Sequence, residues 1–332
     1  MGKCTSFTYP LDPAQQSALL QILNQGNYRS ATVEHAQAAA DGEDYRVVLY
    51  NSGKCLVQGK GAEDFVLFVL EPEVLKGAGV GYEDVLDPDA LRPRMGVDES
   101  GKGDFFGPLV VAAAYVDEPL VGRMRELGVK DSKSITSDKR MTEIARELHK
   151  GLGTQRYTLI SIGPAAYNRL YAKMRNVNRI LAWAHARAIE NLLDQVPDCP
   201  LAISDQFGNK SQVEKALMAK GRKIELIQRH KAESDIAVAA ASILARARFI
   251  HALKDMAEKY GAPFPKGASA AVRAAAIELV RKREPNILLE TAKCHFKTTD
   301  AVLTQLNLTR DTLGPAGHIL SKTAATRGKP SD

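Results

Sequence analysis

The sequence lacks the features of secreted, disulfide-bonded and membrane-spanning proteins. Its 332 residues include only four cysteines, Cys4, Cys55, Cys199 and Cys294, which are far apart and form no C-x-x-C pair. This spacing excludes a disulfide framework, argues against zinc and predicts reduced thiols. No apolar run approaches the roughly 18 residues needed to cross a membrane, and the N-terminus has no apolar signal core. We therefore expect a cytoplasmic protein without a membrane partner.

Acidic residues are in excess in the first part of the chain and scarce in the second. Residues 1–90 hold 6 Lys and Arg against 13 Asp and Glu, a net charge of −7. Residues 91–332 hold 39 Lys and Arg against 26 Asp and Glu, a net charge of +13. A basic region of this size is typical of a protein that binds a polyanion. On charge alone, a basic but merely solvated surface is the alternative.

Hydrophobic periodicity predicts a small α+β module, a linker and a larger α/β domain. The module is assigned to residues 1–80, with a helix at 13–25, a hairpin of two strands at 45–60 and a second helix at 62–75. Gly, Pro and acidic residues mark a linker at 81–93. The larger domain, 94–310, alternates strands with helices and is followed by a polar tail at 311–332. Its predicted strands lie at 94–100, 105–117, 154–163, 200–208 and 223–230, and its predicted helices at 138–148, 178–196 and 234–261.

The stretch GVDESGKG, residues 96–103, is one position short of a phosphate-binding P-loop. Gly103 stands where the Ser or Thr that holds magnesium should be. Asp98 and Glu99 lie inside the loop, where two carboxylates would repel a triphosphate. The stretch is therefore better interpreted as an acidic strand end followed by a glycine-rich turn.

Isolated acids elsewhere in the larger domain suggest a metal centre. Asp98 and Glu99 can meet at one site only if the strand turns at Glu99, because neighbours on a strand point to opposite faces. Asp205 directly follows the apolar strand PLAIS, and Glu233 and Asp235 open an alanine-rich helix, where a helix cap is the alternative role. Clustered carboxylates need cations, and oxygen ligands select Mg²⁺ or Mn²⁺. Two such ions suit displacement at a phosphodiester, so a nuclease is expected.

Four ordered motifs in residues 94–300 resemble the ribonuclease HIII family of type 2 ribonucleases H. These motifs are DESGKGDFFGPLVVAAAYV, LGVKDSKSIT, AISDQFGN and KAESDIAVAAASILAR. The hairpin LYNSGKCLVQGKG is similar to the TATA-binding-protein-like domain that precedes the catalytic domain in this family. The resemblance implies an RNase H-like mixed sheet flanked by helices. It also implies hydrolysis of the RNA strand of RNA/DNA hybrids with two Mg²⁺ or Mn²⁺ ions, giving 5′-phosphate and 3′-hydroxyl ends, without an obligatory protein partner.

The resemblance also assigns site residues. The catalytic and metal-binding quartet falls on Asp98, Glu99, Asp205 and Glu233. The spacing from Glu233 to the AAAS segment is one residue shorter than the family pattern, so Asp235 is an alternative fourth ligand. Substrate contacts are expected from Ser100, Gly101, Lys102, Gly103, Ser132 and Lys133, with Ser132 and Lys133 on a backbone phosphate. A merely flexible turn is the alternative for the Gly-Lys-Gly segment.

Because the N-terminal module is acidic overall, it can bind nucleic acid only through a locally basic surface. Its hairpin carries Arg46, Lys54 and Lys60 without an acid. We hypothesise that this sheet face contacts substrate while the acids occupy the helical side and the linker. His185 and Trp183 follow a helical pattern and are interpreted as packing residues. Two other functions are kept open: incision at single ribonucleotides in DNA, as by ribonuclease HII, and hybrid binding without catalysis.

Overall fold

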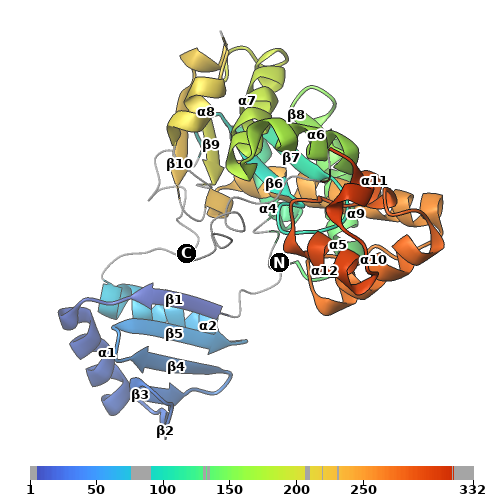
Figure 1. The fold of residues 1–332 in the computed structure, drawn as a ribbon. Coiled ribbons are helices and arrows are strands. Elements are labelled where there is room, and N and C mark those ends of the chain that lie inside the picture. Colours follow the sequence, from blue (N-terminus) through green and yellow to red (C-terminus); the bar gives the residue numbers. More distant parts are fainter. Residues whose placement is uncertain are drawn as a thin grey trace, which may run out of the picture. The chain divides into compact units, whose positions relative to one another are not determined.

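The computed structural model describes residues 6–75, 91–129, 132, 135–205, 210–218, 220–229, 232–315 and 317. The chain divides into two compact units, residues 1–91 and 92–332, which Figure 1 shows in ribbon form. The division falls inside the predicted linker, whose residues 81–90 lie outside the described part. The first helical turn of the predicted polar tail belongs to the fold, because a 3₁₀-helix spans Arg310–Leu313 (η5). Each unit is described separately.

The N-terminal unit is a five-stranded antiparallel sheet with helices on one face. The strand order is β1-β5-β4-β3-β2, and the bounds are β1 Ser6–Pro10, β2 Arg29–Ala31, β3 Ala36–Asp41, β4 Tyr45–Tyr50 and β5 Lys54–Gly59. The helices are α1 Pro13–Gln25 and α2 Ala62–Phe65, which continues as the wider π-helix η1 Val66–Leu75. Val47 and Val57 pack against Leu19 and Leu70 in one core, whereas the alternating residue Arg46 is exposed. The predicted hairpin and both predicted helices are present.

The C-terminal unit is built on a mixed five-stranded sheet in the order β10-β9-β6-β7-β8. The bounds are β6 Arg94–Ser100, β7 Leu109–Val116, β8 Tyr157–Ile162, β9 Leu201–Asp205 and β10 Glu225–Arg229. β7 is antiparallel to β6 and β8, while β9 is parallel to β6 and β10. Strands β6, β8, β9 and β10 therefore end at the same edge of the sheet, which we call the carboxyl edge, and β7 begins there.

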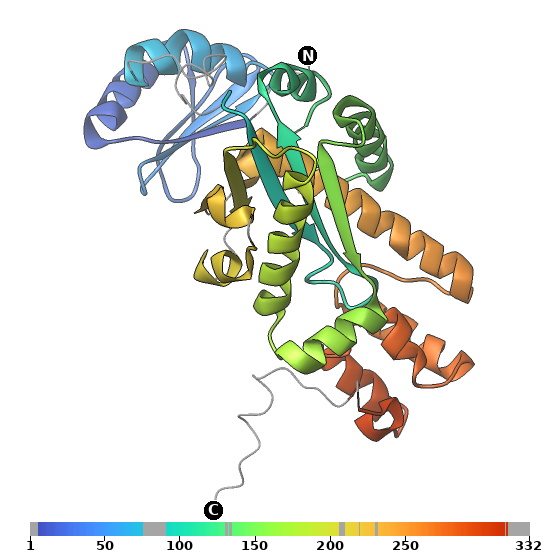
Figure 2. The ribbon, with the colours of Figure 1, turned by 90° about the horizontal axis from the view of Figure 1, so that it is seen from above.

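Two long helices cover the faces of this sheet (Figure 2). Helix α9, Ile236–Tyr260, packs on β6 and β7, and α7, Val177–Leu193, shares the core on the other face. Within the described residues, α9 is long and apolar enough to span a membrane, yet 72% of its apolar window is buried inside the unit. It is therefore a core helix. The remaining helices are α4 Glu118–Glu126, α5 Asp138–Leu152, α6 Pro164–Met174, α8 Lys210–Ala216, α10 Ala270–Lys282, α11 Ile287–Thr291 and α12 Lys297–Gln305, with 3₁₀-helices η3 Gly221–Lys223 and η4 Ala232–Ser234.

The contact between β6 and α9 requires a glycine at position 96. A Cβ atom on Gly96 would lie 2.1 Å from the backbone C of Ala237 and 2.1 Å from the backbone N of Val238. We expect Gly96→Ala to push α9 off the sheet and to lower the free energy of unfolding by about 1–3 kcal/mol. Urea denaturation of the full chain measures this change.

The matched control for this substitution is Gly122→Ala. Gly122 lies inside α4, and a Cβ atom there meets open space. The added methyl group should therefore raise stability by about 0.5–1 kcal/mol, because alanine favours the helix. Equal stability changes in the two variants would contradict the tight contact between β6 and α9.

Candidate active site

The carboxyl edge places two of the predicted acids side by side. β6 and β9 are paired in parallel up to Val97 and Ser204. Asp98 and Asp205 come directly after these residues, so they lie on neighbouring strands and point to the same face of the sheet. Gly96 shares that face and touches α9. The two carboxylates therefore meet between the carboxyl edge and α9.

Glu99 does not turn toward Asp98 as the sequence analysis expected. Strand β6 continues beyond it, with Glu99 paired to Val111 and Ser100 paired to Val110. The backbone turns one residue after Ser100, at Gly101, where φ is +90°. Asp98 and Glu99 thus leave the strand on opposite faces, Asp98 toward α9 and Glu99 toward α7.

Hydrogen-bond donors around Asp98 favour its charged form, whereas its buried position disfavours that form. One of its carboxylate oxygens accepts the Glu99 backbone N–H at 2.8 Å, and the Ser242 side chain on α9 donates a further hydrogen bond. Burial, together with the charge of Glu99, nevertheless raises the pKa of Asp98 to about 7. A cation at this carboxylate would offset both effects.

Ser132 supports this arrangement rather than facing solvent. Its hydroxyl lies 2.7 Å from the Ser242 hydroxyl, and its backbone carbonyl accepts from Arg246 at 2.5 Å. Only 4% of Ser132 is exposed, which differs from the open position expected for a phosphate contact. The structure therefore links Ser132 to Asp98 through Ser242. Lys133, the other residue predicted to contact phosphate, lies outside the described residues.

His185 orients the second acid, although the sequence analysis interpreted it as a packing residue. Its ring lies fully buried on α7, with Nε2 3.0 Å from Glu99 Oε2. On the other carboxylate oxygen, Lys102 Nζ lies 3.5 Å away. Burial acts to raise the pKa of Glu99, but the hydrogen bond and charge of His185, with a smaller effect of Lys102, lower it below its usual value. The sequence signal was a histidine on the apolar face of an amphipathic helix.

The two candidates for the fourth acid differ in what surrounds them. Glu233 lies half-buried in η4, which packs over β9 just before α9. Asp235 caps α9 by accepting the backbone N–H groups of Ala237 and Val238 at 2.8 and 3.3 Å. Its other oxygen accepts from Arg94 at 2.7 Å.

The pairing with Arg94 directs Asp235 away from the other acids. Arg94 begins β6, four residues before Asp98, a distance of about 13 Å along an extended strand. Arg229 also lies 3.5 Å from the same oxygen. One oxygen of Asp235 therefore caps the helix and the other forms the buried ion pair. The helix cap is the alternative role that the sequence analysis gave for this residue.

The glycine loop that follows β6 combines a glycine required by the fold with one that is not. Gly101 has a positive φ, and a Cβ there would lie 2.3 Å from the Pro108 carbonyl oxygen. A Cβ at Gly103, in contrast, would meet nothing within 4 Å. The packing of the chain thus explains why residue 101 is a glycine. It does not explain the glycine at position 103, where a bound molecule would have room.

The C-terminal helical region holds this loop in place. Asp104 accepts the Gly267 backbone N–H at 2.6 Å, and the buried ammonium of Lys293 donates to the carbonyls of Phe106, Gly107 and Pro108 at 3.2, 2.7 and 3.4 Å. Burial lowers the pKa of Lys293 to about 7, and the Asp104 carboxylate acts in the opposite direction. The turn after β6 is therefore fixed by residues more than 160 positions away.

The predicted contact residues of the N-terminal module lie on or beside its hairpin. Arg46 and Lys54 are exposed on β4 and β5, and Lys60 is exposed just beyond β5. Arg46 is engaged by Asp41 of β3 through hydrogen bonds of 2.5 and 2.9 Å. The hypothesis that acids avoid this sheet is therefore wrong for Asp41. Lys54 and Lys60 have no acidic partner among the described residues.

The donor atoms at the carboxyl edge suit a hard divalent cation. Asp98, Asp205 and Glu99 offer carboxylate oxygens, which Mg²⁺ and Mn²⁺ prefer. The raised pKa of Asp98 indicates that the site favours neutralisation of its charge. Within the described residues, no group of three or more His, Cys, Asp or Glu side chains is already arranged to hold a metal ion. Bringing Glu99 to the same ion as Asp98 therefore requires a local side-chain movement.

Comparisons with known proteins agree with these features. The model of the ribonuclease HII family matches residues 95–299. Ribonuclease HIII of Protochlamydia amoebophila is 40% identical over 304 residues, covering 91% of this chain and 98% of the relative. Ribonuclease HIII of Chlamydia pneumoniae is 39% identical over 298 residues, covering 89% and 97%. The crystal structure of Bst-RNase HIII in complex with Mn²⁺ is 30% identical, with a TM-score of 0.61, and the match covers 91% of this chain and 99% of that one.

These matches confirm the predicted mixed α/β fold and the resemblance on which it was based. They extend through the N-terminal module as well as the larger unit, since nine tenths of the chain is covered. The chain belongs to the ribonuclease HII family, and it matches ribonuclease HIII proteins over most of its length.

Proposed function

We propose that this protein is an endoribonuclease that hydrolyses the RNA strand of RNA/DNA hybrids. The observation that carries the proposal is the pair Asp98 and Asp205 at the carboxyl edge, beside a glycine loop that contains Lys102. A protein that only bound the hybrid would gain nothing from carboxylates facing phosphate, because they repel it unless a metal intervenes. Family membership supports the same reaction.

Asp98, Glu99, Asp205 and Glu233 are the residues that would hold two divalent ions, Mg²⁺ or Mn²⁺. When bound, such ions activate a water molecule and stabilise the leaving oxygen of an in-line displacement at phosphorus. Glu233 is preferred to Asp235 because both oxygens of Asp235 are already engaged. His185 holds one oxygen of Glu99 and thereby limits the positions that this carboxylate can take.

The glycine loop is proposed to distinguish RNA from DNA. Because a side chain at Gly103 would meet open space, the absence of one leaves room for a ribose close to the backbone. A backbone amide in that position can reach the 2′-hydroxyl, the group that marks RNA. Ser100 and Lys102 flank the same turn, and Lys102 supplies positive charge beside Glu99.

The test is cleavage of an end-labelled RNA/DNA hybrid with Mg²⁺ or Mn²⁺, beside a DNA duplex that contains one ribonucleotide. We expect cuts along the RNA strand of the hybrid, with 5′-phosphate and 3′-hydroxyl ends. Faster incision at the single ribonucleotide would favour the ribonuclease HII-like alternative. Binding of the hybrid without metal-dependent cleavage would instead identify a non-catalytic binder.

Replacing His185 should weaken metal binding without removing any proposed ligand. His185→Phe keeps an aromatic ring in the buried position but removes the hydrogen bond to Glu99. We expect a loss of about 10- to 100-fold in Mn²⁺ affinity or in cleavage rate. His185→Gln retains a donor and should recover part of the loss. Calorimetric Mn²⁺ titration and cleavage at saturating Mn²⁺ measure both effects, and wild-type values for His185→Phe would rule out the orienting role.

The N-terminal module is proposed to bind the hybrid through Lys54 and Lys60. Deleting residues 1–90 should weaken binding and reduce its salt dependence, because fewer phosphates are neutralised. In the full chain, Lys54→Gln with Lys60→Gln should lower the magnitude of the negative slope of log K against log salt by up to about 1.8. Arg46→Gln should lower it less than either lysine, since Asp41 already engages Arg46. An unchanged slope after the deletion would contradict a binding role for the module.

A further inference from the structure

The connection between α6 and α7 carries exposed positive charges that the candidate active site does not use. From residue 148 to residue 189 the sequence contains seven Lys and Arg but no Asp or Glu. Four of these cations, Arg169, Lys173, Arg175 and Arg179, are exposed on α6, its end and the start of α7. We call these four residues the basic ridge. Within the described part of the chain, none of them has an acidic partner.

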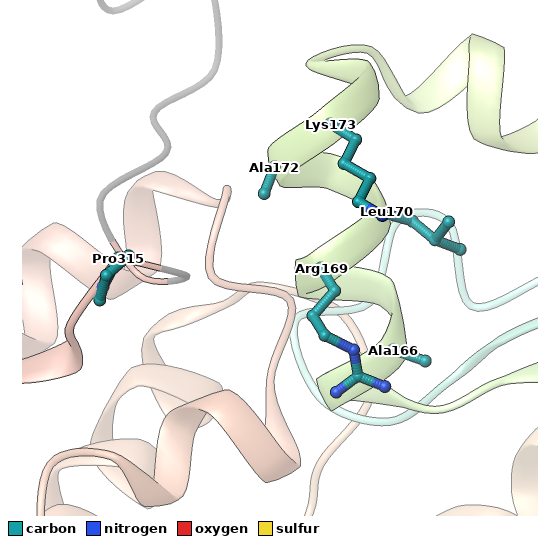
Figure 3. Close-up of a pocket in the computed structure, with 6 residues that line it drawn as sticks. All are labelled: Ala166, Arg169, Leu170, Ala172, Lys173 and Pro315. Atoms are coloured by element: carbon teal, nitrogen blue, oxygen red, sulfur yellow. The ribbon is translucent and has the colours of Figure 1, made fainter.

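Parts of the basic ridge are unfavourable for the local helices. Arg169 and Lys173 are four residues apart on α6, so their like charges repel. Both side chains line a hollow of about 510 Å³, and Figure 3 shows Pro315 across from them. Arg175 ends α6 with φ 49° and ψ 28°, the left-handed conformation in which glycine is usual. Helix stability alone would favour a glycine at position 175 and an acid at position 179 in the first turn of α7, although Lys173 in the last turn of α6 suits the helix dipole. The repulsion between Arg169 and Lys173, the backbone of Arg175 and the charge of Arg179 therefore point to an interaction.

The basic ridge begins at the same edge of the sheet as the candidate active site. β8 ends at Ile162, which pairs with Leu109, while the neighbouring Val110 pairs with Ser100 at the end of β6. Helix α6 starts two residues after β8 ends, at Pro164. Figure 2 shows α6 at the end of the sheet where the 101–108 loop also lies.

Helix α7 connects the basic ridge to the acids. His185 on α7 contacts Glu99, and Arg179 precedes His185 by six residues, or about 9 Å along the helix axis. Duplex DNA carries one phosphate charge per roughly 1.7 Å of its axis when both strands are counted. A duplex held at the acids therefore has phosphates within reach of the ridge.

A shared brace fixes the basic ridge relative to the glycine loop. Asn168 of α6 is buried and donates to the Ala292 carbonyl at 2.9 Å, while its own oxygen accepts the Cys294 backbone N–H at 2.9 Å. Between these two residues lies Lys293, which holds the Gly107 carbonyl. Residues 292–294 thus contact both α6 and the loop, so α6 and the loop are anchored to the same short segment.

We propose that the basic ridge binds the phosphate backbone of the substrate duplex outside the cleavage position. The proposal rests on the proposed function and adds a further contact zone to it. Lys and Arg on a rigid surface neutralise phosphates and release counterions without reading sequence. Such a contact sets the affinity and the register of the duplex on the enzyme. The acids and the glycine loop determine which strand is cut and at which position.

The experiment measures binding of a fluorescein-labelled RNA/DNA hybrid to the full chain, by anisotropy, without divalent metal and over a range of KCl concentrations. Arg175→Gln combined with Arg179→Gln should make the negative slope of log K against log salt shallower by about 1.8. With metal, kcat at saturating hybrid should stay at the wild-type value while KM rises. The control is Arg140→Gln with Arg146→Gln on α5, where the cations lie beside Glu143 and Glu147; its slope should not change.

Arg175→Gly separates binding from stability. Glycine suits the left-handed conformation at this position, so Tm should stay the same or rise while the salt slope becomes shallower by about 0.9. A wild-type slope in both ridge variants, or an equal fall in the α5 control, would overturn the proposal. If the wild-type chain binds the hybrid but does not cleave it, the proposed function fails, while the salt slopes still decide the role of the ridge.

Discussion

Asp98→Asn is expected to lower metal-dependent cleavage of the hybrid by about 10³-fold or more, which corresponds to at least about 4 kcal/mol of transition-state stabilisation. Asn keeps the size of the side chain but removes the negative charge that a divalent ion needs. Asp98 lies beside Asp205 at the carboxyl edge, so its replacement affects the centre of the proposed metal site. The measurement is single-turnover cleavage with Mg²⁺ and with Mn²⁺.

The thermal stability of Asp98→Asn is the control that separates loss of activity from loss of folding. Burial raises the pKa of Asp98 to about 7, so the charged carboxylate is unfavourable in the metal-free fold above that pH. A neutral Asn removes this cost, and Tm without metal at pH 8 should not fall. An inactive but well-folded variant would support the catalytic role, whereas intact metal-dependent cleavage would show that the assignment of Asp98 is wrong.

Asp235→Asn is expected to destabilise the fold by about 3–5 kcal/mol, the cost of leaving a buried charge without its partner. Asp235 and Arg94 form an ion pair of 2.7 Å in which both side chains are about 95% buried. Asn can still cap α9, so the loss should reflect the unpaired Arg94 charge. Urea denaturation measures the change in the free energy of unfolding.

Glu233→Gln is the matched comparison for Asp235→Asn. Glu233 lies in η4 and is partly exposed, so its replacement should change stability by no more than about 0.5 kcal/mol. Cleavage should nevertheless fall steeply, because a proposed metal ligand is lost. The opposite pattern, with a stable but inactive Asp235→Asn and an active Glu233→Gln, would assign the fourth place to Asp235.

The sequence was most informative where a local pattern encodes a local structure. The helix at 13–25 begins after Asp12, whose side chain accepts the Gln15 backbone N–H, and the turn before Lys54 contains the glycine that its conformation requires. The Ala-rich strand β3 carries no such signal, because alanine does not favour a strand. Helix α6 and helices α10 to α12 also went unassigned.

The positions of the acids were predictable, but their directions were not. Asp98 lies near the end of β6 and Asp205 ends β9, and a pattern of strands alternating with helices brings such ends to one edge. The expected turn at Glu99 came two residues later, because pairing with β7 continues to Ser100. The residue at which a strand ends depends on how far it pairs with the neighbouring strand, and the local sequence does not identify that strand.

By itself, the sequence determined the two-part organisation, the acidic strand ends, the glycine loop and the family. Only the tertiary structure decided that His185 orients Glu99 and that Asp235 pairs with Arg94. These partners are 86 and 141 residues apart in the chain. Hydrophobic periodicity tells which face of a helix is buried, but not which side chain it meets there. That choice is made when α7 and α9 pack on opposite faces of one sheet.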